Sequence, residues 1–129
     1  MTLTDKMKAE VAALWAKAEP QAKTLGDEVV NRMLITFPQY KLYFEDKPDM
    51  GEKIMAALGE AVQHIDNLSE DLSALNALEM SEKLYQLLLP HTFLVTLAVH
   101  FPTDFTSSMY AAWVHFFDEI KKILFSKEK

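Results

Sequence analysis

The residues best able to do chemistry in this sequence are its four histidines, and their spacing limits what they could do. His64, His91, His100 and His115 are nine or more residues apart, so no two of them form the i, i+4 pair that binds zinc on a helix. The sequence contains no cysteine, which excludes disulfides, thiolate catalysis and zinc–thiolate sites. No Ser/His/Asp order and no glycine-rich phosphate loop occurs.

Glu79 and Glu82 are three residues apart, but such a pair is more often a solvated helix face than an acid–base dyad. The seven methionines of the chain are most simply explained as adaptable core filler. The sequence therefore does not predict an enzyme.

Composition narrows the class of protein further. The chain has 129 residues and a formal net charge of −6, which argues against binding duplex nucleic acid or an anionic membrane surface. Half of its residues are apolar, enough for one packed core. No apolar run has the length of a signal peptide or a membrane span, so we expect a cytoplasmic protein.

Helical periodicity predicts an all-α fold in a single domain spanning residues 1–129. Thr4 is placed to cap the first helix, and Pro20 to end it. Further helices are expected at 21–36, 38–43, 49–67, 69–101 with a kink at Pro90, and from Thr106 onward. The apolar stripe of the last helix is predicted to contain Tyr110, Trp113, Phe117, Ile120 and Leu124.

Several segments together resemble the α-type chains of vertebrate haemoglobin. The resemblance rests on Thr4-Asp5-Lys6, Ala13-Leu14-Trp15, Lys41-Leu42-Tyr43-Phe44, Ala61-Val62-Gln63-His64-Ile65-Asp66-Asn67-Leu68 and Phe101-Pro102-Thr103-Asp104-Phe105-Thr106. The fourth segment is similar to the end of helix E in embryonic and D-type or μ-type α chains. The resemblance implies a globin fold and a family role in haem-based, reversible oxygen binding and transport.

Two glycines agree with this resemblance. Gly26 and Gly51 fall where globin helices B and E cross so closely that a side chain would clash. Glycine within a helix costs about 1 kcal/mol relative to alanine, and close backbone approach is the usual reason to retain it.

The resemblance also locates the residues that would flank a haem iron, and neither is histidine. Met50 stands at the distal position and Glu79 at the proximal position, so we expect a haem-deficient chain. The remnant pocket would consist of Phe44, Met50, Ile54, Leu75, Leu78, Glu79 and Leu124. If any residue ligates a metal there, Glu79 or Met80 is expected to do so. The positions that the resemblance assigns also leave open a pair of soft thioether ligands, Met50 with Met80.

Matching the family requires two deletions. About nine residues are missing between Phe44 and Met50, which shortens the CD region, and about four between Met80 and Leu87, which shortens the FG region. No breaker remains before Pro90, so we predict that helix F extends continuously across 69–89.

Surfaces for a partner subunit are expected to persist. Arg32 and His91, together with Phe116, stand where the resemblance implies contact with a β-type globin chain, or with a second copy of this chain. The carboxyl-terminal clamp of the family is replaced by Lys127-Glu128-Lys129.

Three interpretations remain open from the sequence. The first is an α-like globin without haem that is retained as a subunit partner. The second is a working haem protein with non-standard ligation. The third is a haem-free helical interaction module, with the leucine-rich stretch 84–89 facing its partner.

Overall fold

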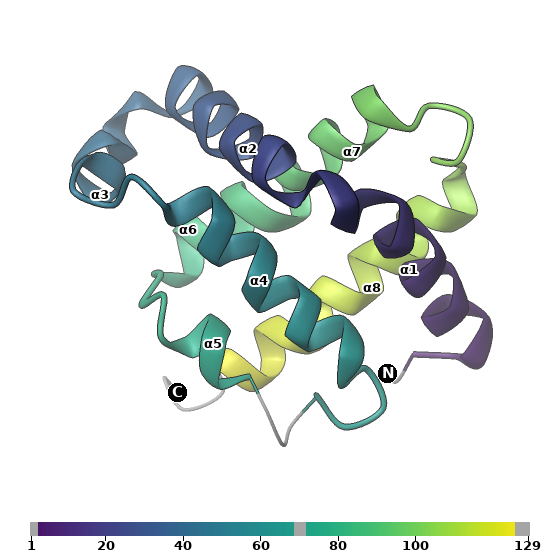
Figure 1. Ribbon diagram of the computed structural model, residues 1–129. Coiled ribbons are helices and arrows are strands. Elements are labelled where there is room, and N and C mark those ends of the chain that lie inside the picture. Colours follow the sequence, from purple (N-terminus) through teal and green to yellow (C-terminus); the bar gives the residue numbers. More distant parts are fainter. Residues whose placement is uncertain (1–2, 69–71, 126–129) are drawn as a thin grey trace.

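The computed structural model describes residues 3–68 and 72–125, and every regular element within those ranges is helical (Figure 1). The α-helices are α1 (Asp5–Ala18), α2 (Ala22–Thr36), α3 (Lys41–Glu45), α4 (Met50–Gln63), α5 (Ser73–Asn76), α6 (Glu82–Gln86), α7 (Leu94–His100) and α8 (Ser107–Leu124). A π-helical segment, Leu87–Phe93, joins α6 to α7. The expected all-α fold is confirmed over these ranges.

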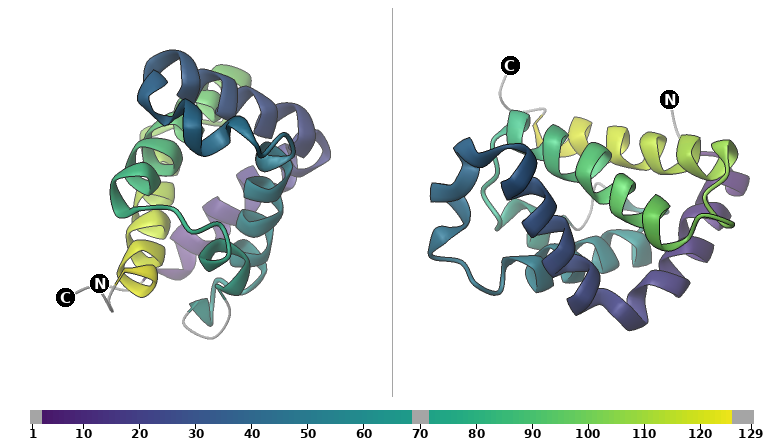
Figure 2. Two further views of the ribbon diagram at one scale, coloured as in Figure 1. Left: turned by 90° about the vertical axis from the view of Figure 1, so that its left-hand side faces the viewer. Right: turned by 90° about the horizontal axis from the view of Figure 1, so that it is seen from above.

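The helices cross one another rather than forming parallel layers. In Figure 1, α4 runs diagonally in front of α8, while α2 passes across the top of the molecule from α1 to α3. The view from above in Figure 2 shows the α6–π–α7 stretch extending along α8. Only the segment 46–49 separates α3 from α4, so the shortened CD region is present as expected.

Hydroxyl caps begin the first and last helices as the sequence predicts. The Thr4 side chain accepts a hydrogen bond from the Met7 backbone N–H at 3.1 Å, and Thr106 does the same for Met109 at 3.1 Å. Each cap satisfies a backbone donor that has no partner within its own helix.

The closest helix crossing joins α2 to α4 through two glycines. A Cβ added to Gly26 would lie 2.7 Å from the carbonyl carbon of Gly51, and one added to Gly51 would lie 2.6 Å from that of Gly26. Both distances are shorter than any ordinary contact, so only glycine permits this crossing. The close approach predicted at these two positions is confirmed.

An aromatic cluster fills the centre of the core around Trp113 of α8. The Trp113 ring lies 5.5 Å from Phe93, 5.4 Å from Phe116 and 5.5 Å from Phe117, measured between ring centroids. Trp15 of α1 approaches it at 6.5 Å. Contacts of this kind fix α1 and the π-helical segment against α8.

The prediction of one continuous helix across 69–89 is wrong. Helix α5 ends at Asn76, and α6 begins only at Glu82. Between them Glu79 adopts a left-handed backbone with φ of 53°, and the Ser81 side chain accepts a hydrogen bond from Leu84 N–H at 3.1 Å, which starts a new helix. The expected start of that helix, at residue 69, lies outside the described residues.

Pro90 changes the helix without ending it. It lies inside the π-helical segment, because proline lacks an N–H and its ring clashes with the preceding turn of an α-helix.

The leucines expected to face a partner point inward instead: Leu84, Leu88 and Leu89 are buried. The interpretation of 84–89 as an exposed docking surface is therefore wrong.

Candidate functional site

The expected pocket residues on α3, α4 and α5 are packed into the core. Phe44 is 5% exposed, Met50 2%, Ile54 0% and Leu75 2%, and all four belong to one continuous cluster of buried apolar side chains. Helix α4 places Met50 and Ile54 on its inner face because they are four residues apart. The structure thus brings these side chains together as close-packed core.

A small cavity survives beside Met80, at the end of the chain segment that follows α5. Its volume is about 100 Å³. The residues that line it are Leu75, Asn76, Glu79, Met80, Tyr85, Leu124 and Phe125. Binding pockets for drug-sized ligands have volumes of roughly 300–1,000 Å³, so this cavity is too small for a ligand of that size.

Glu79 is exposed, whereas the residues on either side of it, Leu78 and Met80, are half-buried and buried. Its backbone N–H donates to the Asn76 carbonyl at 3.2 Å, which closes the turn after α5. Met80, the next residue, is only 9% exposed. The left-handed turn therefore directs the carboxylate to solvent and the thioether to the core.

Tyr43 makes the most direct link between α3 and this turn, although the sequence analysis did not select it as a site residue. Its hydroxyl donates to the Leu78 carbonyl at 2.5 Å, and Leu78 itself is half-buried. Burial, and then the negative charge of Glu79, raise the pKa of the Tyr43 hydroxyl to about 12, so it remains a donor at neutral pH.

Lys47 holds Tyr43 from the other side. Its ammonium lies 4.6 Å from the centroid of the Tyr43 ring and donates to the Tyr43 carbonyl at 2.8 Å. Phe44 meets the same ring nearly edge-on, at 4.9 Å between centroids and 86° between planes. The ring position is fixed by these contacts together with the hydroxyl bond.

A second tyrosine that the sequence analysis missed closes the far side of the cavity. The hydroxyl of Tyr85 donates to the Phe117 carbonyl at 2.7 Å, and its ring meets Phe125 at 5.6 Å. Burial, with a smaller contribution from Asp118, raises the pKa of Tyr85. This bond ties α6 to α8 behind Met80.

None of the four histidines lines this cavity. His91 and His100 belong to the π–α7 stretch and His115 to α8, while His64 follows the end of α4. Within 3–68 and 72–125, no three histidine or acidic side chains converge as a metal site would require.

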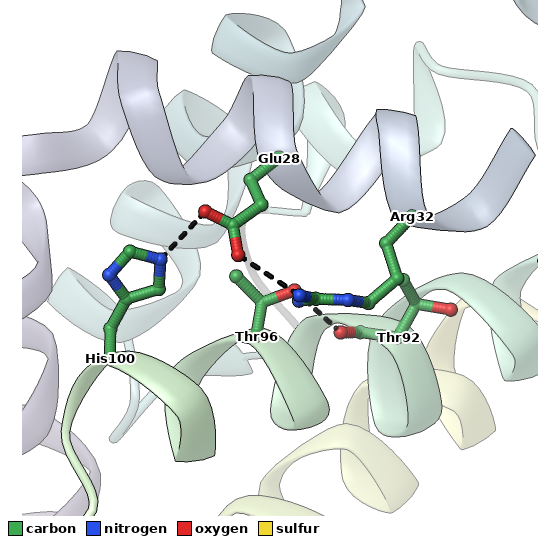
Figure 3. Close-up of polar contacts among 5 residues, drawn as sticks. All are labelled: Glu28, Arg32, Thr92, Thr96 and His100. Atoms are coloured by element: carbon green, nitrogen blue, oxygen red, sulfur yellow. Dashed lines mark hydrogen bonds and ion pairs between the residues drawn. The ribbon is translucent and has the colours of Figure 1, made fainter. Parts of the chain in front are cut away.

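A polar network joins α2 to α7 at the surface expected to meet a partner (Figure 3). The Glu28 carboxylate lies 2.7 Å from Nε2 of His100 and 3.2 Å from the Arg32 guanidinium. Arg32 also donates to the Thr96 hydroxyl at 2.7 Å, and Thr96 in turn donates to the Thr92 carbonyl at 3.0 Å. The hydrogen bond with His100, followed by the positive charges nearby, lowers the pKa of Glu28.

The three expected partner residues have different environments. The Arg32 side chain is 30% exposed and engaged in the network above, while His91 is exposed and meets Phe37 edge-on at 6.2 Å. Phe116, by contrast, is 0% exposed. Phe116 was expected to contact a partner, but α8 turns its ring into the core toward Trp113.

Exposed apolar side chains nevertheless occur on α7, near the end of α2 and on α8. On α7, Val95 is 41% and Val99 59% exposed, and near the end of α2 Ile35 is 82% exposed. Tyr110 on α8, which was expected in the buried stripe, is 49% exposed. We refer to Ile35, Val95, Val99 and Tyr110 as the outer apolar set.

None of the helices in the described part of the chain is long and apolar enough to cross a membrane.

Comparison with known proteins agrees with this architecture. Residues 27–124 match the sequence profile of the globin family. Haemoglobin subunit alpha-3 of Xenopus laevis is 42% identical over 144 aligned positions, which cover 98% of this chain and 99% of that protein. Haemoglobin subunit zeta of Homo sapiens is 36% identical over 140 positions, with the same coverage.

Proposed function

The chain belongs to the globin family, as a vertebrate haemoglobin α-type chain, and from that membership we propose that it is a pairing subunit that has lost histidine-ligated haem. The family carries haem and transports oxygen. In this chain the proposal separates two properties that the family combines: the surface that pairs subunits is kept, and the chemistry that holds iron is lost. The proposed role is not enzymatic.

The observation that carries the proposal is the position of Glu79. The residue that stands where the resemblance puts the proximal ligand lies in a left-handed turn between two helices, with its side chain exposed. A proximal ligand must instead project from a helix toward iron, and it is normally an imidazole. An exposed carboxylate on a turn meets neither requirement.

The other donors nearby do not fit haem either. Met50 and Met80 are 2% and 9% exposed, and both thioethers belong to the packed cluster that includes Ile54 and Leu75. A thioether is a soft ligand that in haem proteins accompanies a histidine, and no histidine lines the cavity. The residues present therefore do not fit a histidine-ligated haem.

The pairing half of the proposal is supported by the outer apolar set and by Arg32. Val95 and Val99 share one face of α7 because they are four residues apart. The hydrogen bond from Arg32 to Thr96 joins α7 to the helix that carries Ile35. Apolar side chains with a neighbouring arginine are typical of protein interfaces. A β-type globin chain is the partner that we propose, and a second copy of this chain is the alternative.

The test of the haem half is an absorbance spectrum of the purified chain mixed with haemin, then reduced. We expect no spectrum of histidine-ligated haem and no reversible oxygen uptake. A deoxy-ferrous spectrum typical of histidine ligation would contradict the proposal. The double variant Met50→His with Glu79→His provides a comparison: if it retains haemin while the natural chain does not, the missing ligands account for the loss. If neither retains haemin, closure of the pocket accounts for it.

A further inference from the structure

The geometry points to the hydrogen bond between Tyr43 and Leu78 as a latch that holds the former ligand pocket shut. This inference deepens the proposed function by naming the contact that keeps the space between α3 and the 77–81 turn closed. It rests on that proposal only for the statement that haem is absent.

The latch joins two parts of the chain that are 35 positions apart in the sequence. Tyr43 lies on the five-residue helix α3, and Leu78 on the turn that follows the four-residue helix α5. Helices this short are not stable by themselves, so the turn depends on tertiary contacts for its position. In Figure 1 the coil between α5 and α6 lies on the same side of the molecule as α3.

The bond is placed to hold the turn against α3. The Tyr43 hydroxyl donates to the backbone carbonyl of Leu78, which lies two residues beyond the end of α5. Burial and the Glu79 carboxylate keep the hydroxyl protonated, with a pKa of about 12. Lys47 and Phe44 fix the ring, so the hydroxyl is pre-positioned rather than free to rotate away.

The cavity beside Met80 is the space that would become a pocket if the 77–81 turn moved away from α3. Met80 lies in the turn and is buried, and together with Leu75 it lines the cavity of about 100 Å³. Displacing the turn would withdraw Met80 and enlarge this cavity, whose apolar lining also includes Leu75 and Leu124. Release of the latch should therefore admit a flat apolar molecule.

The test compares Tyr43→Phe with Tyr40→Phe in the full-length chain. Tyr43→Phe removes only the hydroxyl and leaves the ring contacts. Tyr40→Phe is a matched control on the adjacent turn, Pro38–Tyr40. Amide hydrogen exchange of residues 72–81 is measured without ligand, and binding of the dye ANS and of haemin is measured separately. We expect Tyr43→Phe to accelerate exchange at least fivefold and to increase dye binding severalfold, while Tyr40→Phe changes neither.

Equal rates of amide hydrogen exchange at residues 72–81 in Tyr43→Phe and in the natural chain would overturn the proposed latch. Should Tyr43→Phe fail to fold, by circular dichroism, Lys47→Gln provides a second variant. It removes the ammonium from the ring while retaining the hydroxyl, and should accelerate exchange of 72–81 by a smaller factor; no acceleration would again overturn the inference. The exchange experiment contains no haem, so it succeeds or fails independently of the proposed loss of haem ligation.

Discussion

Gly26 and Gly51 face each other at the crossing of α2 and α4, with each backbone occupying the space that the other's Cβ would need. The contact is backbone against backbone, so no side chain can rotate to relieve a clash. Two helices held this close also fix where Met50 and Ile54 enter the core, because both residues lie on the same helix as Gly51.

Gly26→Ala should therefore destabilise the protein strongly. The added methyl would gain about 1 kcal/mol of helix propensity but force the helices apart, and we expect a net loss of about 3 kcal/mol in the free energy of unfolding. Urea denaturation measures it. Gly59→Ala is the matched control, since its Cβ would meet only the Trp15 side chain, at 3.3 Å. Equal stability losses in the two variants would contradict this account.

Local signals predicted much of the fold. Thr4 and Thr106 cap helices because the hydroxyl bond depends only on residues within the next turn. The close crossing at Gly26 and Gly51 could be predicted because glycine destabilises a helix and is usually retained there only where two backbones approach closely. By contrast, the break at 77–81 depends on a balance between a left-handed turn at Glu79 and continued helix, and no single residue there is a strong helix breaker.

The candidate site was less predictable for a related reason. Tyr43 contacts the carbonyl of Leu78, which is 35 positions later in the chain. The spacing of residues in the sequence does not show which distant residues the fold brings into contact. Phe116 and Phe117 are adjacent, and both are buried, because α8 has neighbours on more than one side. A single apolar stripe could not show which of the aromatic positions on α8 would be exposed.

The left-handed backbone of Glu79 predicts an unusual pattern of substitution effects. Asparagine tolerates this conformation, whereas a β-branched residue is strained in it. We expect Glu79→Asn to increase the free energy of unfolding by roughly 0.5 kcal/mol and Glu79→Val to lower it by about 1 kcal/mol. Thermal denaturation of both variants checks the order. If valine proved as stable as asparagine, Glu79 would not occupy a left-handed turn.

The lowered pKa of Glu28 predicts a loss of stability in acid. A carboxyl whose pKa is lower in the folded than in the unfolded chain stabilises the fold above its ordinary value of 4.5, and this contribution is lost as the pH falls through the folded value. Glu28→Gln should cost about 1 kcal/mol at neutral pH. As the pH falls from about 7 through 4.5 and below, the natural chain should lose more stability than the variant does.

Asp27→Asn is the control for this experiment. Asp27 lies next to Glu28 on α2, and its carboxylate pairs with Lys23 at the surface, where it is 47% exposed. Exposed pairs of this kind contribute little, so Asp27→Asn should follow the pH dependence of the natural chain in urea titrations. Parallel behaviour of Glu28→Gln and the natural chain across this pH range would rule out the assigned role of Glu28.

The pairing surface can be tested by placing a charge in the outer apolar set. Val99 is 59% exposed near the end of α7, where a lysine is compatible with the helix dipole. Val99→Lys should therefore leave the stability of the isolated chain within about 0.5 kcal/mol of its natural value. At an interface, however, the ammonium would have to be buried, and we expect the affinity for a β-type globin chain to fall at least about tenfold, or 1.4 kcal/mol.

Sedimentation of the natural chain and its variants, alone and mixed with β-type chains at micromolar concentration, measures this difference. Ala16→Lys is the matched control because Ala16 is exposed near the end of a different helix, α1, so it adds the same charge outside the outer apolar set. Pairing that is weakened by Val99→Lys but not by Ala16→Lys places the partner on α7. Equal pairing by both variants would remove α7 from the interface. A natural chain that stays monomeric in both samples would end the subunit proposal itself, since an exposed apolar face with neither a β-type chain nor a second copy bound to it has no pairing role.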